Sequence, residues 1–291
     1  YVAFDNGSSL TIQSFNLSTN ALVNSGSVGI SAAGGNLAAD SSGVYLTYIS
    51  TDPMIARFNL TLGTPAATKN LVTDFGFAVP SNATVKCFNG RKFIFVNDNG
   101  DVGLRELDST LGVTATGRVL GVTFHDSAYS SLTNTIYMCV NSAGYFARAF
   151  ANMDITNSTP PVVGQFSSMG GSDQRITAYG NYIYYRESGS SYTGSTMDAR
   201  SGFSTPISYS PYSFGVDKLG RMWIYNYPMT GAPYLIQTDI DNSVKQSLKI
   251  FNTTYMNSGV SGKLDASTGI MYMLHFNASN QLAVYKYNSN Y

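Results

Sequence analysis

An Asn or Asp recurs seven times along this chain, each time at the end of a run of residues that favours β-strand. The seven copies are Asn16, Asn59, Asp108, Asp154, Asp198, Asp239 and Asn288. Their separations are 43, 49, 46, 44, 41 and 49 residues. Each of the first six is followed four residues later by Gly, Asn or Ser, which tolerate the backbone of a tight turn. A period of this length holds four antiparallel strands and their turns, so residues 1–291 are predicted to form one repeat array in a single domain.

Within each repeat the predicted strands follow one order. A short apolar first strand ends in a turn, and a second strand rich in aromatic and β-branched residues follows. The third strand carries the recurrent Asn or Asp, and the fourth strand is more polar. Second strands are predicted at residues 44–49, 92–96, 135–140, 182–186, 221–225 and 270–276, and fourth strands at, for example, 69–75, 162–166 and 244–251. No segment of ten residues or more has an apolar period of 3.6, so helices are expected to be rare.

The turn before the second strand has a recognisable form in three repeats. Asp40-Ser-Ser-Gly43, Asp217-Lys-Leu-Gly220 and Asp265-Ala-Ser-Thr-Gly269 each join an Asp to a Gly and then to an apolar strand. This pattern resembles the inter-strand turn of β-propeller proteins with blades of 40–50 residues, and the resemblance covers essentially the whole chain. It implies an all-β fold, a seven-bladed antiparallel β-propeller with about four strands per blade. The signatures of WD40, kelch and sialidase repeats are missing, so the resemblance identifies an architecture and not a family.

The predicted strands do not close the ring. The chain begins on the second strand of a blade, at residues 1–4, and ends just after a third strand, at residues 281–287. The closing blade is therefore expected to be incomplete within this chain. One interpretation is that the natural chain is longer or that this blade has three strands. The other is that a further chain supplies the missing strand by β-addition, which would link propellers together.

The low charge of the chain excludes two classes of partner. Only 12% of the residues are charged, and the formal net charge is zero, so no excess of Lys and Arg is available to bind nucleic acid or an anionic membrane surface. No apolar run approaches the roughly 18 residues that a membrane-spanning helix needs, so membrane insertion is not expected.

The start of the chain and its low charge point to the secretory route, and its sequons are compatible with that route. The chain starts at Tyr1 without an initiator Met, inside a strand-like run, so an upstream segment is expected to have been removed. We therefore expect an extracellular or cell-surface protein that is partly N-glycosylated. The candidate glycosylation sites of the form Asn-x-Ser/Thr are Asn6, Asn16, Asn59, Asn82, Asn157, Asn252 and Asn277.

The carboxylates that follow the first strands are the candidate metal ligands. Asp40, Asp217 and Asp265 lie where some β-propeller hydrolases and lactonases gather such ligands. A Ca²⁺ ion needs six to eight oxygen ligands, and only three of the seven repeats offer this Asp. Turn formation is therefore the preferred role of all three, no cofactor is expected, and a Ca²⁺ site is the alternative. Together with His125, they are the first candidates for the active site of a hydrolase or lyase.

The two cysteines, Cys87 and Cys139, are predicted on strands of adjacent blades. A disulfide requires Cα atoms about 4.4–6.8 Å apart, a separation that adjacent blades can provide. Two small buried thiols are the preferred interpretation, and a disulfide is the alternative.

Aromatic residues are abundant, with 21 Tyr and 16 Phe. Most are expected to pack between blades, but tyrosines concentrate between residues 180 and 235. We predict a binding surface there that includes Tyr185, Tyr192, Tyr212 and Tyr227. The predicted function is a binding or structural assembly module whose partners are other protein chains, copies of itself, or glycans. The alternative is a secreted hydrolase or lyase with a metal site at the mouth of the channel.

Overall fold

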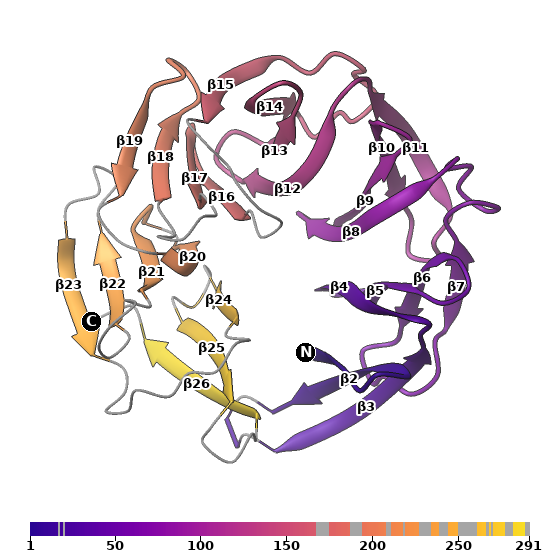
Figure 1. Cartoon of the computed structure of the whole chain (residues 1–291). Helices are drawn as coiled ribbons and strands as arrows, with labels where there is room; N and C mark the ends of the chain where they lie inside the picture. Colours follow the sequence, from indigo (N-terminus) through magenta and orange to yellow (C-terminus); the bar gives the residue numbers. More distant parts are fainter. Residues whose placement is uncertain are drawn as a thin grey trace. The chain divides into compact units, whose positions relative to one another are not determined.

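Antiparallel β-sheet makes up the regular structure in this computed structural model (Figure 1). The structure describes residues 1–16, 18–19, 21–166, 175–186, 194–207, 211–217, 219–226, 234–238, 244–249, 261–265, 268, 270–276 and 282–288. For some strand residues, chiefly after residue 210, it describes only the backbone. Helices are absent from all these segments, and with them any apolar helix long enough to cross a membrane.

The described residues form twenty-six strands arranged in seven hydrogen-bonded sheets (Figure 1). The first three sheets are β1 (Val2–Asp5), β2 (Ser9–Phe15) and β3 (Leu22–Gly29); β4 (Ala32–Asp40), β5 (Gly43–Ile49), β6 (Pro53–Phe58) and β7 (Ala67–Asn70); and β8 (Pro80–Phe88), β9 (Arg91–Asp98), β10 (Asp101–Leu107) and β11 (Val113–Val119). The next two sheets are β12 (Thr123–Ser130), β13 (Thr135–Asn141), β14 (Tyr145–Ala151) and β15 (Val162–Phe166); and β16 (Arg175–Tyr179), β17 (Tyr182–Arg186), β18 (Gly194–Asp198) and β19 (Ser204–Ile207). The last two are β20 (Pro211–Val216), β21 (Met222–Asn226), β22 (Tyr234–Thr238) and β23 (Val244–Lys249); and β24 (Ser261–Asp265), β25 (Ile270–Phe276) and β26 (Leu282–Asn288).

The seven sheets follow the seven repeats in order. Each strand pairs with the next along the chain, so every sheet is an antiparallel meander. Within the described residues, the five middle sheets have four strands and the first and last have three. The first sheet starts with a second-type strand and the last ends with a third-type strand, which fits the expected incomplete blade.

The chain divides into two compact units, which are described separately. Unit 1 contains Tyr1–Phe124, Val140–Ser142 and Asn152–Pro161. Unit 2 contains His125–Cys139, Ala143–Ala151 and Val162–Tyr291. That residues 1–291 form a single domain stays a prediction.

In unit 1, successive sheets pack face to face through apolar side chains. Leu10 and Ile12 of the first sheet pack against Val44, Leu46 and Phe58 of the second. The opposite face of the second sheet packs against the third in the same way, through a cluster that includes Tyr45, Ile55, Val85, Ile94 and Val96. Side chains alternate between the two faces of a strand, so neighbouring residues of β5 serve two different cores.

Unit 2 uses the same packing. Tyr137 and Phe166 of the fourth sheet contact Ile183, Tyr185 and Met197 of the fifth. The other face of the fifth sheet presents Tyr184 to a cluster that includes Val216, Met222 and Ile236 of the sixth. The apolar cores in these four interfaces are what the blade pattern of the sequence predicted.

Glycines on fourth strands allow a turn of the following repeat to approach closely. A Cβ atom at Gly26 of β3 would lie 2.5 Å from the carbonyl oxygen of Gly63, in the turn between β6 and β7. A Cβ at Gly117 of β11 would lie 1.9 Å from the carbonyl oxygen of Ile155, in the connection that follows β14. In unit 2, Gly164 of β15 lies against the Met197 side chain and Gly202 of the next sheet. Each of these turns contains a recurrent Asn or Asp, so it docks onto the fourth strand of the preceding sheet.

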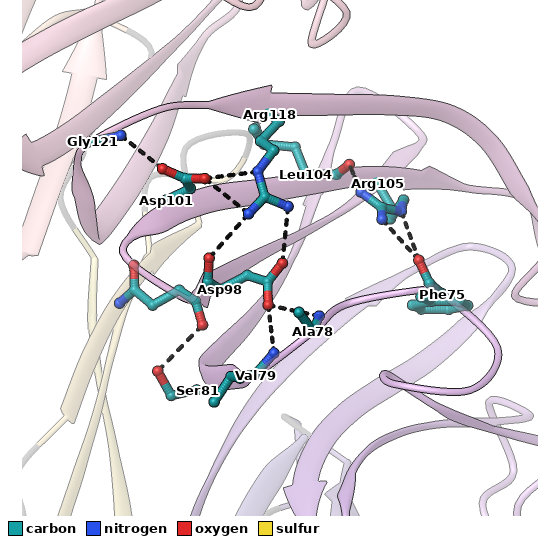
Figure 2. Close-up of polar contacts among 11 residues, drawn as sticks. Phe75, Ala78, Val79, Ser81, Asp98, Asp101, Leu104, Arg105, Arg118 and Gly121 are labelled. Atoms are coloured by element: carbon teal, nitrogen blue, oxygen red, sulfur yellow. Dashed lines mark hydrogen bonds and ion pairs between the residues drawn. The ribbon is translucent and has the colours of Figure 1, made fainter.

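The hairpin between β9 and β10 is tied to its surroundings by buried charge (Figure 2). The Asp98 carboxylate is fully buried and accepts hydrogen bonds from the backbone N–H groups of Ala78 and Val79 at 2.8 and 2.7 Å. Its other oxygen lies 3.0 Å from Arg118 Nη1, and Arg118 also binds Asp101. These contacts offset the cost of removing the Asp98 charge from water. They join the β7–β8 connection to β9 and β11.

The predicted fourth strand at residues 69–75 is shorter in the structure, because β7 ends at Asn70. The Asn70 side-chain oxygen accepts hydrogen bonds from the N–H groups of Val72 and Thr73 at 2.8 and 3.2 Å. The Asp74 carboxylate accepts from the Asn70 N–H at 2.7 Å. This reciprocal pair of side-chain to backbone bonds closes a turn and stops the strand.

Candidate interaction surface

The recurrent Asn and Asp residues form turns between third and fourth strands. Asn16 Oδ1 accepts hydrogen bonds from the N–H groups of Ser18 and Thr19 at 2.8 and 3.1 Å. The carboxylates of Asp108, Asp154 and Asp198 accept from the N–H two residues later, at 2.7, 3.0 and 2.9 Å. The predicted turn role is therefore confirmed for these four copies. Asp239 lies outside the described residues, and only the backbone of Asn288 is described.

Hydrogen bonds to these carboxylates favour their charged form. The Thr110 hydroxyl, together with the N–H groups of Gly112 and Thr110, lowers the pKa of Asp108. The Thr156 hydroxyl and N–H lower the pKa of Asp154, and the Arg200 side chain does so for Asp198. The negative charge of each of these carboxylates is therefore stabilised by hydrogen-bond donors of its own turn.

The carboxylates of the three candidate metal ligands each accept hydrogen bonds from residues of their own turns. Asp40 accepts hydrogen bonds from the N–H and hydroxyl of Ser42, and its other oxygen lies 3.2 Å from Lys92 Nζ. Burial alone would raise the pKa of Asp40, but the bonds from Ser42 and the ion pair with Lys92 lower it overall. Asp265 accepts from the N–H and hydroxyl of Thr268.

Asp217 is almost fully buried and binds several donors. Its Oδ1 atom accepts from the N–H groups of Leu219 and Arg221 at 2.9 and 3.1 Å. Its Oδ2 atom accepts from Arg221 Nε at 2.8 Å and Trp223 Nε1 at 3.2 Å. Among the residues that the structure describes, no three His, Cys, Asp or Glu side chains gather as a metal site requires. The metal hypothesis thus receives no support from this part of the chain.

His125 and Asp126 have structural contacts on β12. The His125 ring packs on Tyr145 with centroids 5.7 Å apart, and burial lowers the pKa of His125. Asp126 Oδ2 accepts a hydrogen bond from the N–H of Ile176 on β16 at 2.9 Å. This bond links the first strands of consecutive sheets, and it gives Asp126 a structural role.

Both cysteines are thiols in the structure. Cys139 is fully buried on β13, and Cys87 is partly buried on β8. Burial raises the pKa of Cys87 to about 12 and that of Cys139 well above its ordinary value. Neither thiol is therefore readily ionised.

The predicted tyrosine surface is only partly described. Tyr185 is fully buried on β17, and its ring packs on Phe166 with centroids 4.1 Å apart. The prediction that Tyr185 faces a binding surface is therefore wrong, because its side chain belongs to the core between the fourth and fifth sheets. Tyr192 and Tyr227 lie outside the described residues, and only the backbone of Tyr212 is described.

Exposed apolar side chains occupy turns at one end of the unit 2 sheets. Leu132 in the β12–β13 turn is 65% exposed, Phe203 in the β18–β19 turn 79%, and Leu219 in the β20–β21 turn 62%. In an antiparallel meander the first-to-second and third-to-fourth turns lie at the same end of the sheet, so these side chains share one end. Sequence analysis missed all three, and only Leu219 lies inside a turn that it named, Asp217–Gly220.

Contacts between turns join these positions. Leu132 Cδ1 lies 3.9 Å from the place of a Cβ atom at Gly180, in the β16–β17 turn. The carbonyl oxygen of Asn181 in that turn accepts a hydrogen bond from Ala199 N at 2.8 Å, and Asp198 N donates to the carbonyl oxygen of Phe203. On the other side, Gly220 approaches the Tyr179 ring. We call this set the turn surface, consisting of Leu132, Gly180, Asn181, Arg200, Phe203 and Leu219.

Arg200 is the charged member of the turn surface. Its Nη2 atom lies 2.7 Å from Asp198 Oδ2, and its Nε donates to Asp198 Oδ1 at 2.9 Å. The guanidinium also lies over the Tyr182 ring and donates to the Tyr182 hydroxyl at 3.1 Å. The bond to Asp198 raises the pKa of Arg200. Its positive charge is therefore balanced within its own turn.

Comparison with known proteins identifies the fold. No protein-family model and no curated protein matches the sequence. The chain is similar to the WD40 domain of coronin from Toxoplasma gondii, with a TM-score of 0.61 and 13% identity over 99% of this chain and 78% of that chain. It is also similar to the Dos1 propeller, with a TM-score of 0.59 and 11% identity over 91% of this chain and 73% of that one. These likenesses confirm an all-antiparallel β-propeller; at such identities they bear on fold alone.

Proposed function

We propose that this protein is a binding module that recognises other proteins within an extracellular or cell-surface assembly. The turn surface carries this proposal, because it presents exposed apolar side chains on turns whose polar groups are largely bonded internally. A partner can bury Leu132, Phe203 and Leu219 while those turn hydrogen bonds stay intact. The propeller fold, which this chain shares with its WD40 neighbour, supports the proposal by analogy alone, because one fold hosts many functions.

N-linked glycans belong to the same proposal. The support is the exposure of every sequon asparagine within the described residues, namely Asn6, Asn16, Asn59, Asn82 and Asn157. In Asn6, Asn16 and Asn157 the side-chain oxygen is hydrogen-bonded to the N–H of the Ser or Thr two residues later. Asn252 and Asn277 lie outside the described residues. Glycans as ligands of the tyrosine-rich region between residues 180 and 235 stay a prediction.

The assembly proposal includes self-association, in which a strand of one chain is added to a sheet of another. The third-type strands β2, β6, β10, β14, β18 and β22 each pair with a fourth strand. Within the described residues, β26 pairs only with β25, and β1 pairs only with β2. Such sheet edges can accept an extended strand from another chain.

Production of the chain through a eukaryotic secretory pathway tests these elements together. The intact mass of the chain should fall when N-glycans are removed. The substitutions Asn16→Gln and Asn59→Gln should each lower the number of N-glycans per chain by one.

Light scattering across a concentration series should detect oligomers of the chain. Partners captured by cross-linking must bind again when purified, with a Kd below about 100 µM. Secretion without glycans, a strictly monomeric chain, or no purified protein that binds would each contradict the corresponding element.

A further inference from the structure

Strand β1 is exposed, whereas the second-type strands of the next two sheets are buried. β5 is buried from Gly43 to Tyr48 and β9 from Lys92 to Asp98, and each of them pairs with a first-type strand. In β1, by contrast, Phe4 and Asp5 are exposed, and the described residues provide no first-type strand beside it. The first sheet therefore offers an edge that the second and third sheets have closed.

Two residues of β1 present their backbone polar groups at this edge. The Asn6 N–H donates to the carbonyl oxygen of Ser9 at 3.1 Å, so the backbone of Asn6 faces β2. Hydrogen-bonding directions alternate along an antiparallel strand, so the N–H and C=O groups of Ala3 and Asp5 face away from β2. Backbone groups on such an edge can pair with an added strand.

A further unpaired group lies on β4, the first-type strand of the second sheet. The Asn36 N–H donates to Thr47 Oγ1 on β5 at 3.2 Å, so the N–H of the next residue, Leu37, points away from β5. Within the part of the chain that the structure describes, the Leu37 N–H has no acceptor. β1 lies against β4, and Ala3 and Leu37 pack on the same apolar cluster. The open edge and the unpaired N–H therefore adjoin one core.

Comparable N–H groups on later first-type strands are bound by a side chain of the preceding first-type strand. Asn36 Oδ1 on β4 accepts from the Val85 N–H on β8 at 3.0 Å. Asp126 Oδ2 on β12 accepts from the Ile176 N–H on β16 at 2.9 Å. The Leu37 N–H thus lacks the partner that a first-type strand beside β1 would carry.

From these observations we infer that the free edge of β1 is the docking site for an extended strand of another polypeptide chain. The strand pairs antiparallel with β1 through the backbone groups of Ala3 and Asp5. Opposite Ala3 it carries an Asn or Asp, whose side-chain oxygen accepts from the Leu37 N–H as Asn36 accepts from Val85. An apolar residue follows, as Leu37 follows Asn36. This inference rests on the proposed assembly function and names the acceptor strand and the chemistry of the donor.

A peptide that copies residues 32–40, with Asn36 in its natural place, tests the inference. Binding of the fluorescent peptide to the full chain is measured by anisotropy, and hydrogen exchange reports on the amides of Ala3, Asp5 and Leu37. The control peptide carries Asn36→Ala. The chain variant Ala3→Pro removes one N–H from the free edge and keeps the N–H groups that face β2. Thermal unfolding shows whether this variant is folded, and the two peptides decide the question if it is not.

The peptide is expected to bind with a Kd below about 1 mM and to slow exchange of the three amides at least tenfold. The control peptide should bind about fivefold more weakly, because it lacks one hydrogen bond. Ala3→Pro should weaken binding of the peptide at least tenfold. Absence of binding, equal affinity of the two peptides, or amides of Ala3 and Asp5 that are already protected in the free chain would overturn the inference.

The same experiment separates the docking site from the proposed function. Oligomers of the wild-type chain that persist when the peptide saturates β1 would overturn the docking site and leave self-association standing. A chain that binds the peptide as expected, but forms no oligomer and binds no purified protein, would contradict the proposed function and leave the docking site standing.

Discussion

Gly117 illustrates how a single residue sets how closely two stretches of backbone in unit 1 approach each other. Replacing it by Ala would place a Cβ 1.9 Å from the carbonyl oxygen of Ile155, so β11 and the facing backbone must separate. Overpacking of this kind typically costs 1–3 kcal/mol, and the obstacle here is backbone, so we expect Gly117→Ala to lower the free energy of unfolding by about 3 kcal/mol. Urea unfolding measures this change.

Gly29 offers a control, because it also lies on a fourth strand of unit 1 but has no atom within 4 Å of an added Cβ. Gly29→Ala should change the free energy of unfolding by less than about 1 kcal/mol, in either direction. Equal effects of the two substitutions would show that Gly117 does not set the spacing.

Sequence analysis at the residue scale succeeded where a local rule determines the side chain. Asn16 and Asp108 could be assigned to turns because the Asx turn is local. Tyr185 and Leu132 could not be placed, because their exposure depends on the neighbouring sheet. Tyrosine is a plausible surface residue, yet packing between the fourth and fifth sheets buries Tyr185; leucine is a plausible core residue, yet Leu132 is exposed in a turn outside that core.

Among the elements, the third-to-fourth turns link stability to pH. Hydrogen bonds lower the pKa of Asp108, Asp154 and Asp198 below the ordinary value of 3.8 in the folded chain. Each carboxylate therefore contributes stability that is fully present above about pH 4 and is lost as the pH falls through the folded pKa. We expect Tm to drop between pH 5 and pH 2, and to drop less in the variant Asp108→Asn/Asp154→Asn/Asp198→Asn.

Asn is a suitable replacement in these turns, since Asn16 already forms the same turn with a side-chain oxygen. The variant should therefore unfold near the wild-type temperature at pH 7, where Arg200 loses a partially exposed ion pair of modest value. Calorimetry over the pH series measures the effect. Parallel curves for the two proteins would show that other carboxylates control acid unfolding.

Strand prediction was most accurate for the second strands. The predictions at residues 182–186 and 270–276 coincide with β17 and β25, because aromatic and β-branched residues favour this position. The fourth strand at residues 69–75 was predicted too long, since the side chains of Asn70 and Asp74 close a turn that resembles a polar strand in sequence. Polar outer strands lack the strong pattern that marks buried ones.

For the whole molecule, the single-domain prediction can be tested with two local probes. Trp223 is the only tryptophan and lies in unit 2, while Cys87 lies in unit 1 and has a pKa raised to about 12 by burial. In a Cys139→Ala variant, Cys87 is the remaining thiol and should react with a thiol reagent only after unfolding. A single domain predicts the same urea midpoint for Trp223 fluorescence and for Cys87 reactivity. Separate midpoints would show that the two units unfold independently.

The close approach at Gly26, Gly117 and Gly164 has a consequence for how such a chain can grow. Each contact joins a glycine of one repeat to a turn of the following repeat. A repeat with both features therefore carries half of two different contacts, one for its predecessor and one for its successor. Tandem duplication of a complete repeat copies both halves in register, so the new copy fits its neighbours without further substitution. Such a chain can therefore lengthen in whole repeats, whereas an insertion of any other length would separate a glycine from the turn that it contacts.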